Sequence, residues 1–249
     1  MLIFIALLIT GLAFLFSMLG LGGAMVYNPL LVWFGYDFKS VVIPTGLLLN
    51  GLTAASAAWV YYRRRMVDLG IALPLVVTST LAAPLGGYVT QFLPTRLLLG
   101  LFTLAVLLAG GRMLLLSGGA EPEAVRGTVR QRAVLGAGLG LGIGFIAGLL
   151  GIGGGFLIVP LLMLMGYPTK VAAATSAFAV VFSSAGGLLG HLAVGHFDGP
   201  LMVITALAVI VGSQAGARVM HTRMQPRHLK RMFGVVLLLI AGKLAVGLL

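Results

Sequence analysis

The chain has 249 residues, of which 60% are hydrophobic and only 8% are charged, and its mean hydropathy is +1.14. A soluble domain carries about 25% charged residues, so this composition excludes a soluble protein and predicts an all-α protein that crosses the membrane many times. The formal net charge of +11 comes from short basic clusters between apolar segments, a pattern that is typical of membrane topology signals and argues against nucleic-acid binding.

Apolar segments long enough to cross a bilayer follow one another along the whole chain. The first of them lacks a basic leader and an A-x-A cleavage signal, so we expect it to stay in the membrane. A hydrophilic linker at Ser117–Arg132 divides the chain into an N-terminal repeat, 1–116, and a C-terminal repeat, 133–249, within one membrane domain. The apolar segments cover residues 1–34, 41–62, 70–92, 97–116, 133–166, 171–194, 200–220 and 232–249.

The two halves share a repeated motif at an offset of 131 residues. SMLGLGGAMVYNPLLVWFGYDFK at 17–39 aligns with GLLGIGGGFLIVPLLMLMGYPTK at 148–170, and ten of these 23 positions are identical. Chance similarity between apolar segments does not explain coincident Gly, Pro, Tyr and Lys. Weaker matches follow, such as Asp68 near Asp198. The halves are therefore predicted to share one fold.

The charges of corresponding loops predict that the second half is inverted relative to the first. Arg63, Arg64 and Arg65 form a basic loop, whereas the matching loop of the second half holds His196 and Asp198. The next pair of corresponding loops has the opposite bias, because the loop of the first half has one Arg and that of the second half has five basic residues. These are Arg96 in the first half, and Arg218, Arg223, Arg227, Lys230 and Arg231 in the second. Basic loops favour the cytoplasm, so this swap indicates an inverted repeat with a cytoplasmic linker and both chain ends outside.

Inversion requires an odd number of membrane elements in each half, and two glycine runs supply the missing one. GLGGA at 20–24 and GIGGG at 151–155 interrupt segments that are too long for one span. Each segment is therefore predicted to form a broken, re-entrant-like hairpin that is followed by about three transmembrane helices.

The tips of these hairpins form the predicted binding site. Glycine runs leave backbone N–H groups free, and the helix beginning beyond each run directs the positive end of its dipole at the tip. Such tips attract anions near the midplane of transporters. In the alternative interpretation, the glycines only allow helices to pack closely. The glycines concerned are Gly20, Gly22, Gly23, Gly151, Gly153, Gly154 and Gly155.

Polar side chains inside the apolar segments complete the predicted substrate site. Hydroxyl and amide groups can replace the hydration shell of an oxyanion without adding a counter-charge. Alternatively, they hydrogen-bond to helix backbones or cap a helix. These residues are Asn28, Thr45, Asn50 and Thr53 in the first half, and Thr175, Ser176 and Ser184 in the second.

His191 is the one titratable residue well inside an apolar segment. It is a candidate for proton coupling, and the alternative is an interfacial histidine. No carboxylate lies in the middle of a segment, which argues against a cation pump. An anion leaving an inside-negative cell gains about 2.3 kcal/mol per charge per 100 mV, so export needs no coupling ion, whereas import would need one, such as H⁺.

Catalytic and cofactor sites are not indicated. The chain has no Cys, which excludes thiolate metal sites and Cys nucleophiles. Ser183 or Ser184 could pair with His191 as a hydrolase dyad, but the sequence around them has no G-x-S-x-G elbow and no acid to orient the histidine. The glycine runs lack the Lys-Ser/Thr of a nucleotide-binding loop. We expect no enzyme activity, no metal and no cofactor.

The glycine motifs G-L-G-G-A…P-L-L and G-I-G-G-G-F-L-I-V-P-L-L, the A-A-A-T-S-A-F stretch at 172–178 and H-x-x-x-G-H-F-D at 191–198 resemble the TauE/SafE family of sulfite exporters, also called the 4-toluene sulfonate uptake permease family. The first half departs from the stronger motif, with Ala24 in place of Gly155 and with Asn28 before Pro29.

This resemblance implies transport of sulfite, of a sulfonate such as sulfoacetate or of a related sulfur-containing anion across the bacterial inner membrane, in either direction. Export is the direction we expect, because it needs no coupling ion. The partners expected are a small anion and the lipid bilayer, and association into homo-oligomers is left open. The rival hypothesis is a non-transporting membrane subunit or lipid-handling scaffold, which would have a packed midplane.

Overall fold

The structure is a computed structural model that describes residues 2–115, 128–191 and 198–223, together with residues 231, 234–235, 238–239, 241–242 and 245–246. Within these residues the secondary structure is entirely helical. The elements are α1 (Leu2–Ser17), α2 (Ala24–Trp33), a π-helical turn η1 (Phe38–Val42), α3 (Ile43–Arg63), α4 (Leu69–Thr90), α5 (Thr95–Leu115), α6 (Val129–Leu150), α7 (Gly155–Leu164), α8 (Thr169–His191) and α9 (Gly199–Arg223).

Five of the described elements are long and apolar enough to cross a membrane: Phe38–Arg63, Leu69–Thr90, Val129–Leu150, Thr169–His191 and Gly199–Val219. The all-helical, multi-span prediction is thus confirmed. The linker residues 117–127 and most of the predicted last span, 232–249, lie outside the described residues.

The second half begins its first helix inside the predicted linker. The hydroxyl of Thr128 accepts a hydrogen bond from the Gln131 amide (3.3 Å), and the Gln131 side chain accepts one from the Thr128 amide (2.9 Å). This reciprocal capping box fixes a helix start. It explains why α6 begins at Val129 and not at 133 as predicted.

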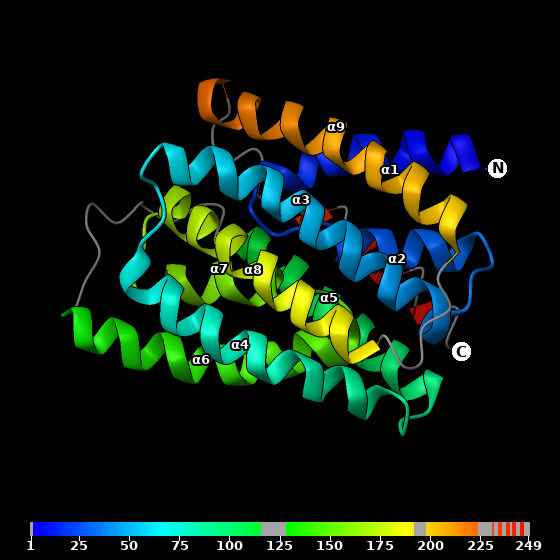
Figure 1. Cartoon of the computed structure of the whole chain (residues 1–249), viewed down its shortest axis with the longest axis horizontal. Coiled ribbons are helices and arrows are strands. Elements are labelled where there is room, and N and C mark those ends of the chain that lie inside the picture. The colour runs from blue at the N-terminus through cyan, green and yellow to red at the C-terminus, as the bar shows by residue number, and fades with distance from the viewer. Residues whose placement is uncertain are drawn as a thin grey trace.

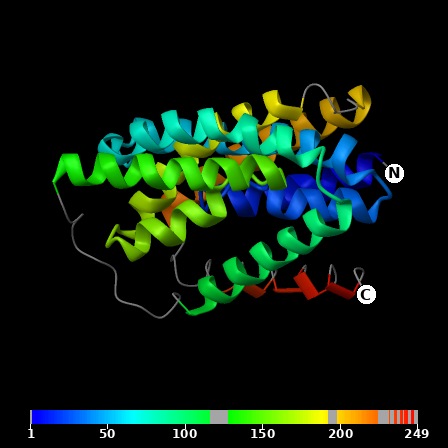
Figure 2. The ribbon, with the colours of Figure 1, turned by 90° about the horizontal axis from the view of Figure 1, so that it is seen from below.

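A stripe of glycines on α6 lies against α4 along the length of both helices (Figures 1 and 2). Gly136, Gly140, Gly144 and Gly148 recur every four residues, and a Cβ at any of them would collide with the α4 backbone. Since membrane helices gain little from burying apolar surface, close backbone approach at small residues is what holds such pairs together. Gly138 and Gly142, on the other side of α6, have no atom within 4 Å of a Cβ position.

The same kind of contact joins α1 to α9. A Cβ at Gly212 or Gly216 of α9 would meet the backbone carbonyls of Thr10 and Phe14. Between these two pairs lie α3 and α8, which pack on each other, with α3 against α9 and α8 against α4. The packing order of the long helices is therefore α1–α9–α3–α8–α4–α6, and Figure 2 shows α5 crossing at an angle outside them.

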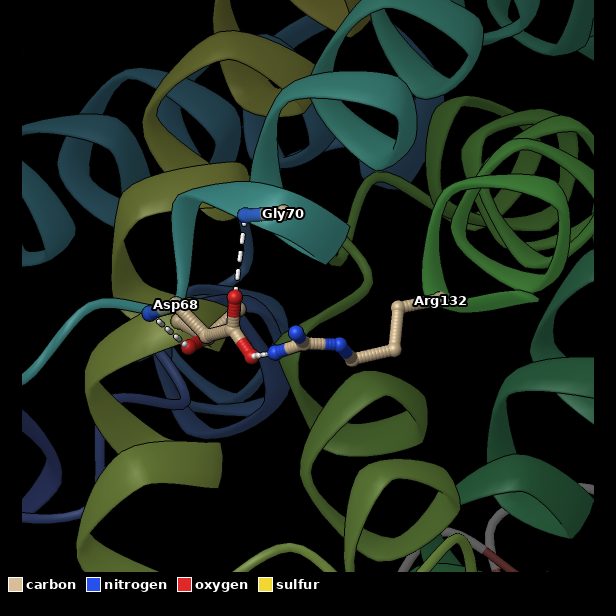
Figure 3. A network of polar contacts seen from close by, with 4 residues as sticks. Asp68, Gly70 and Arg132 are labelled. Carbon is tan, nitrogen blue, oxygen red and sulfur yellow. Dashed lines mark hydrogen bonds and ion pairs between the residues drawn. The ribbon is translucent and has the colours of Figure 1, made fainter. Parts of the chain in front are cut away.

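An ion pair ties three helix starts together at the end of the molecule that carries the Arg63–Arg65 loop (Figure 3). Arg132 on α6 contacts the Asp68 carboxylate at 2.6 Å, and the same carboxylate caps α4 by accepting from the Gly70 amide at 2.9 Å. The Asp68 amide donates to the hydroxyl of Thr175 on α8 at 3.1 Å. Because α4, α6 and α8 all start here, they run in the same direction.

The α4–α6 contact yields a matched pair of substitutions. In Gly144→Ala, the new Cβ would lie 2.5 Å from the Ser79 Cα, so we expect a loss of about 1–3 kcal/mol of stability from overpacking. Gly142→Ala faces open space and should be neutral or stabilising by about 0.5–1 kcal/mol through helix propensity. Thermal unfolding of both variants in detergent checks this, and equal midpoints would contradict the proposed packing.

Candidate functional site

Both glycine runs break their helices with backbone conformations that favour glycine. In the first, α1 ends at Ser17 and α2 begins at Ala24. Gly20 and Gly22 have φ of 66° and 74°, and their counterparts Gly151 and Gly153 have φ of 66° and 70°. Residues with side chains are strained at such angles. The first two repeated glycines therefore turn the chain in the same way at the two tips, 18–23 and 151–154, whereas the next pair differs, with φ of −153° at Gly23 and 80° at Gly154.

The two tips lie against each other inside the helix bundle. A Cβ on Gly155, at the start of α7, would lie 2.5 Å from the carbonyl oxygen of Leu21 in the first tip. Gly22 and its counterpart Gly153 both lie against the side chain of Asn50, so neither has room for a Cβ. The tips and Asn50 therefore form one cluster.

Asn50 connects the two tips through hydrogen bonds. Its Oδ1 accepts from the backbone amides of Gly23 (2.6 Å) and Ala24 (2.9 Å), and its Nδ2 donates to the hydroxyl of Ser184 on α8 (2.8 Å). Asn50 lies halfway along the apolar span Phe38–Arg63 and is 0% exposed. The first amides of a helix have no partner within it, and here the Asn50 carboxamide satisfies two of them.

The second tip is held by hydroxyls on its carbonyl side, while the amides that follow it, at the start of α7, stay open. Ser183 donates to the Gly153 carbonyl at 2.8 Å, and Ser176 makes a longer contact of 3.4 Å with that of Gly155. The amides of Gly155 and Phe156, at the start of α7, have no hydrogen-bond partner among the described residues. The two tips thus differ, because the first has its amides occupied by Asn50.

Asn28 links the first half to the second tip. Its Nδ2 donates to the Gly151 carbonyl at 3.0 Å, and its Oδ1 lies against Gly46. This Oδ1 and the hydroxyl of Thr45 are both buried, and neither has a hydrogen-bond partner in the described part of the chain. An unsatisfied buried acceptor costs about 1–3 kcal/mol, so these two groups mark a place beside the tips where polar contacts are incomplete.

Thr53 faces a residue that sequence reasoning missed. Its hydroxyl bonds the phenol of Tyr27 at 3.0 Å and the Leu49 carbonyl at 2.8 Å. The Tyr27 ring covers Gly23, where a Cβ would collide with it. Tyrosine hydroxyls usually find a partner when buried, so an isolated Tyr four residues after the glycine run was the available signal. Ser183 was noted as polar but not assigned to the site.

Thr175 does not join the tips. Its hydroxyl accepts from the Asp68 amide at the Arg-rich end of the molecule, whereas its neighbour Ser176 contacts Gly155. Successive helix residues point about 100° apart, so the two cannot serve the same site. Gly20 and Gly154 shape the tips through packing, with Gly20 against the Ala173 backbone and Gly154 against Ile143.

His191 is buried, in contrast to the interfacial alternative, and its side chain hydrogen-bonds a backbone carbonyl near the C-terminal end of α6. Its Nε2 bonds the Gly148 carbonyl at 3.1 Å. Tyr61 does the same for α1, because its hydroxyl donates to the Ser17 carbonyl at 3.0 Å. Ser17 and Gly148 are aligned positions in the repeat, so the two aromatic side chains hold equivalent carbonyls just before the tips.

A sequence model described as "Sulfite exporter TauE/SafE" matches residues 3–244, almost the whole chain. The chain belongs to the sulfite exporter TauE/SafE family. A "probable membrane transporter protein YunE" of Bacillus subtilis is 30% identical to it over 92% of this chain and 91% of its own length. A "probable membrane transporter protein" of Methanocaldococcus jannaschii is 25% identical over 89% and 86% of the two chains.

A plant protein of the TauE/SafE family is similar over a shorter region. "Sulfite exporter TauE/SafE family protein 1" of Arabidopsis thaliana is 42% identical over 76 residues, which are 30% of this chain and 17% of that protein. No solved structure matches this chain. Together with the five long apolar helices, the TauE/SafE membership identifies a multi-pass membrane transport protein and not an enzyme.

The position of His191 gives a prediction that separates a structural role from proton coupling. His191→Gln keeps an N–H donor for the Gly148 carbonyl, so we expect its transport rate to have the same pH dependence as that of the parent protein. His191→Leu leaves the carbonyl unsatisfied and should cost about 1–3 kcal/mol of stability.

Uptake of a radiolabelled anion into liposomes, measured between pH 5.5 and 8, gives the pH dependence of transport. Thermal unfolding of the same protein samples gives the change in stability. A pH profile that flattens in His191→Gln would assign His191 to proton coupling instead.

Proposed function

We propose that this protein transports a small sulfur-containing anion, such as sulfite, a sulfonate or sulfoacetate, and binds it near the membrane midplane between the two glycine tips. One observation carries the proposal. The Oδ1 of Asn50 accepts from two consecutive amides at the start of α2, at 2.6 and 2.9 Å. This carboxamide oxygen takes the place that an oxygen of a bound anion would take.

The electrostatics around Asn50 favour a negative ligand. The N-termini of α2 and α7 both adjoin this cluster, and each helix start carries a partial positive charge. Ser184 adds a hydroxyl from α8, and the hydrogen bonds described above for the two tips involve no acidic side chain. Hydrogen bonds to an ionised acceptor are roughly twice as strong as neutral ones, so an oxyanion would compete with Asn50 for the tip amides.

The site is closed in this structure. Asn50, Ser184 and Asn28 are each at most 1% exposed, and residues 20–24 and 151–156 are all buried. A packed midplane is also what a non-transporting scaffold would have. The names of the relatives, which are probable membrane transporters, favour transport, and transport then requires movement of one half against the other.

We infer that the two halves, 1–116 and 133–249, form an inverted repeat joined by the cytoplasmic linker 117–132. The packing order α1–α9–α3–α8–α4–α6 supports this. At the offset of 131 residues, α1 corresponds to α6, α3 to α8 and α4 to α9, and replacing each helix by its partner gives the same order read in reverse. Asp68 and Asp198 also cap equivalent helices, since Asp198 accepts from the Leu201 amide at 3.0 Å. A two-fold arrangement of this kind is common in secondary transporters.

Export is the proposed direction. No acidic side chain lies in the described spans, and the membrane potential alone drives an anion out of an inside-negative cell. Import would require a coupled cation, and His191 is then the proposed proton carrier.

The glycine tips provide the test of the binding site. Gly153→Ala introduces a Cβ against Asn50 and Ser184 at a left-handed φ. We expect sulfite flux in liposomes to fall by at least about tenfold, because displacing Asn50 and Ser184 from the site needs to weaken binding by only about 1.4 kcal/mol to have that effect. Gly138→Ala on α6, where a Cβ meets no atom within 4 Å, is the control and should transport at the parent rate. Normal flux in a well-folded Gly153→Ala protein would refute the tip site.

Inverted topology is tested at two repeat-equivalent helix starts. The chain lacks Cys, so single cysteines at Leu69 and Gly199, both exposed, are unique labelling sites. We expect an impermeant maleimide added to intact cells to label Gly199→Cys, and to label Leu69→Cys only after permeabilisation. Labelling of both from the same side would exclude the inversion while leaving the tip site open.

A further inference from the structure

An apolar groove runs between α3 and α8 on the outer surface of the helix bundle. Its volume is about 310 Å³, and its walls include Trp59 and Tyr62 from α3 and Phe178 and Phe182 from α8. Trp59 and Tyr62 are 57% and 51% exposed. Aromatic residues that stay this exposed on a membrane helix are in contact with lipid, so the groove is a place where an acyl chain can lie.

The shape of the groove is set by ring stacking above a floor of small residues. Tyr62 stacks on Phe178 across the two helices with ring centroids 6.2 Å apart, and Phe178 contacts Phe182 at 5.4 Å. Ala55 and Ala58 form the floor. Because alanine leaves room where larger side chains would fill the interface, the groove stays open between the rings.

A second cavity of about 390 Å³ continues from the groove and is basic. It shares Tyr62 with the groove, and Arg63 and Arg65 line it. The Arg63 guanidinium lies 4.9 Å from the centre of the Trp59 ring, so it stands directly at the mouth of the apolar groove. Arg65 has a φ of 56°, an uncommon value for a residue with a side chain.

The positive charge of Arg63 and Arg65 in this second cavity favours an anionic ligand. Asp68 is the nearby acid, and its carboxylate is paired with Arg132, so Arg63 and Arg65 are not neutralised by it. Basic pockets between membrane helices on the cytoplasmic side suit anionic lipid head groups, and the charge pattern of the loops predicts that side for Arg63 and Arg65.

We propose that this protein binds one anionic phospholipid, with an acyl chain in the α3–α8 groove and its phosphate at Arg63 and Arg65. The proposal does not depend on which solute is transported. It does join lipid to the transport machinery, because the groove lies on the two helices that carry Asn50 and Ser184, and Val181 and Phe182 of the groove directly precede Ser183 and Ser184.

Quenching of Trp59 fluorescence by brominated lipid tests this. The chain has two Trp residues, so Trp33→Phe leaves Trp59 as the sole emitter. The full-length protein is placed in nanodiscs of phosphatidylcholine that contain a small fraction of brominated phosphatidylglycerol or, in parallel, brominated phosphatidylcholine. We expect a preference for the brominated anionic lipid on the order of tenfold, since each Arg near the surface adds severalfold to anionic lipid binding.

Variants of the three loop arginines complete the experiment. Arg63→Gln combined with Arg65→Gln should reduce the preference to nearly none. Arg64→Gln removes a charge from the same exposed loop but does not line the cavity, so it should retain the preference. Equal quenching by the two lipids in the parent protein, or an equal loss in Arg64→Gln, would overturn the proposed site. Because Arg63 contacts the Trp59 ring, its substitution can change the fluorescence directly. Native mass spectrometry of the same variants, scored for retained phosphatidylglycerol, gives a readout that does not depend on Trp59.

Discussion

The structure depends on how backbone amides are satisfied where the chain breaks between α1 and α2 and between α6 and α7. These breaks are buried inside the helix bundle, and non-helical backbone in a membrane protein must be buried in protein or line a wet cavity. At the first tip the amides of Gly23 and Ala24 are satisfied by Asn50, which also reaches Ser184 of the other half. A neutral side chain that supplies one oxygen to two amides holds the site together, and an anion would be able to replace that oxygen.

The remaining contacts bring the tips to this position. Glycine stripes let α6 approach α4, and α9 approach α1, closely enough for backbones to touch. Tyr61 and His191 hold the carbonyls that precede the two tips, and the Asp68–Arg132 pair fixes the starts of α4 and α6. The proposed lipid would add a further contact on α3 and α8, outside the site. Rigid pairs of helices around a cluster of weak polar contacts are consistent with movement of one half against the other.

Much of the fold could be predicted from the sequence, because apolar length and glycine runs are local signals. The predicted spans up to residue 220 agree with the described helices to within a few residues, and the breaks at the glycine runs coincide with the positive φ angles of Gly22 and Gly153. The direction in which a side chain points was not predictable. Thr175 and Ser176 are adjacent and equally polar, but only Ser176 faces a tip, because that depends on how α8 is rotated against its neighbours.

The affinity of purified protein for sulfite, compared between the parent and Asn50→Asp by calorimetry, tests the central claim most directly. A carboxylate at this position would itself occupy the amides of Gly23 and Ala24 and repel a second anion. The account predicts measurable binding to the parent and a dissociation constant raised by at least about tenfold in a folded Asn50→Asp protein. Equal affinity in the two proteins would contradict it.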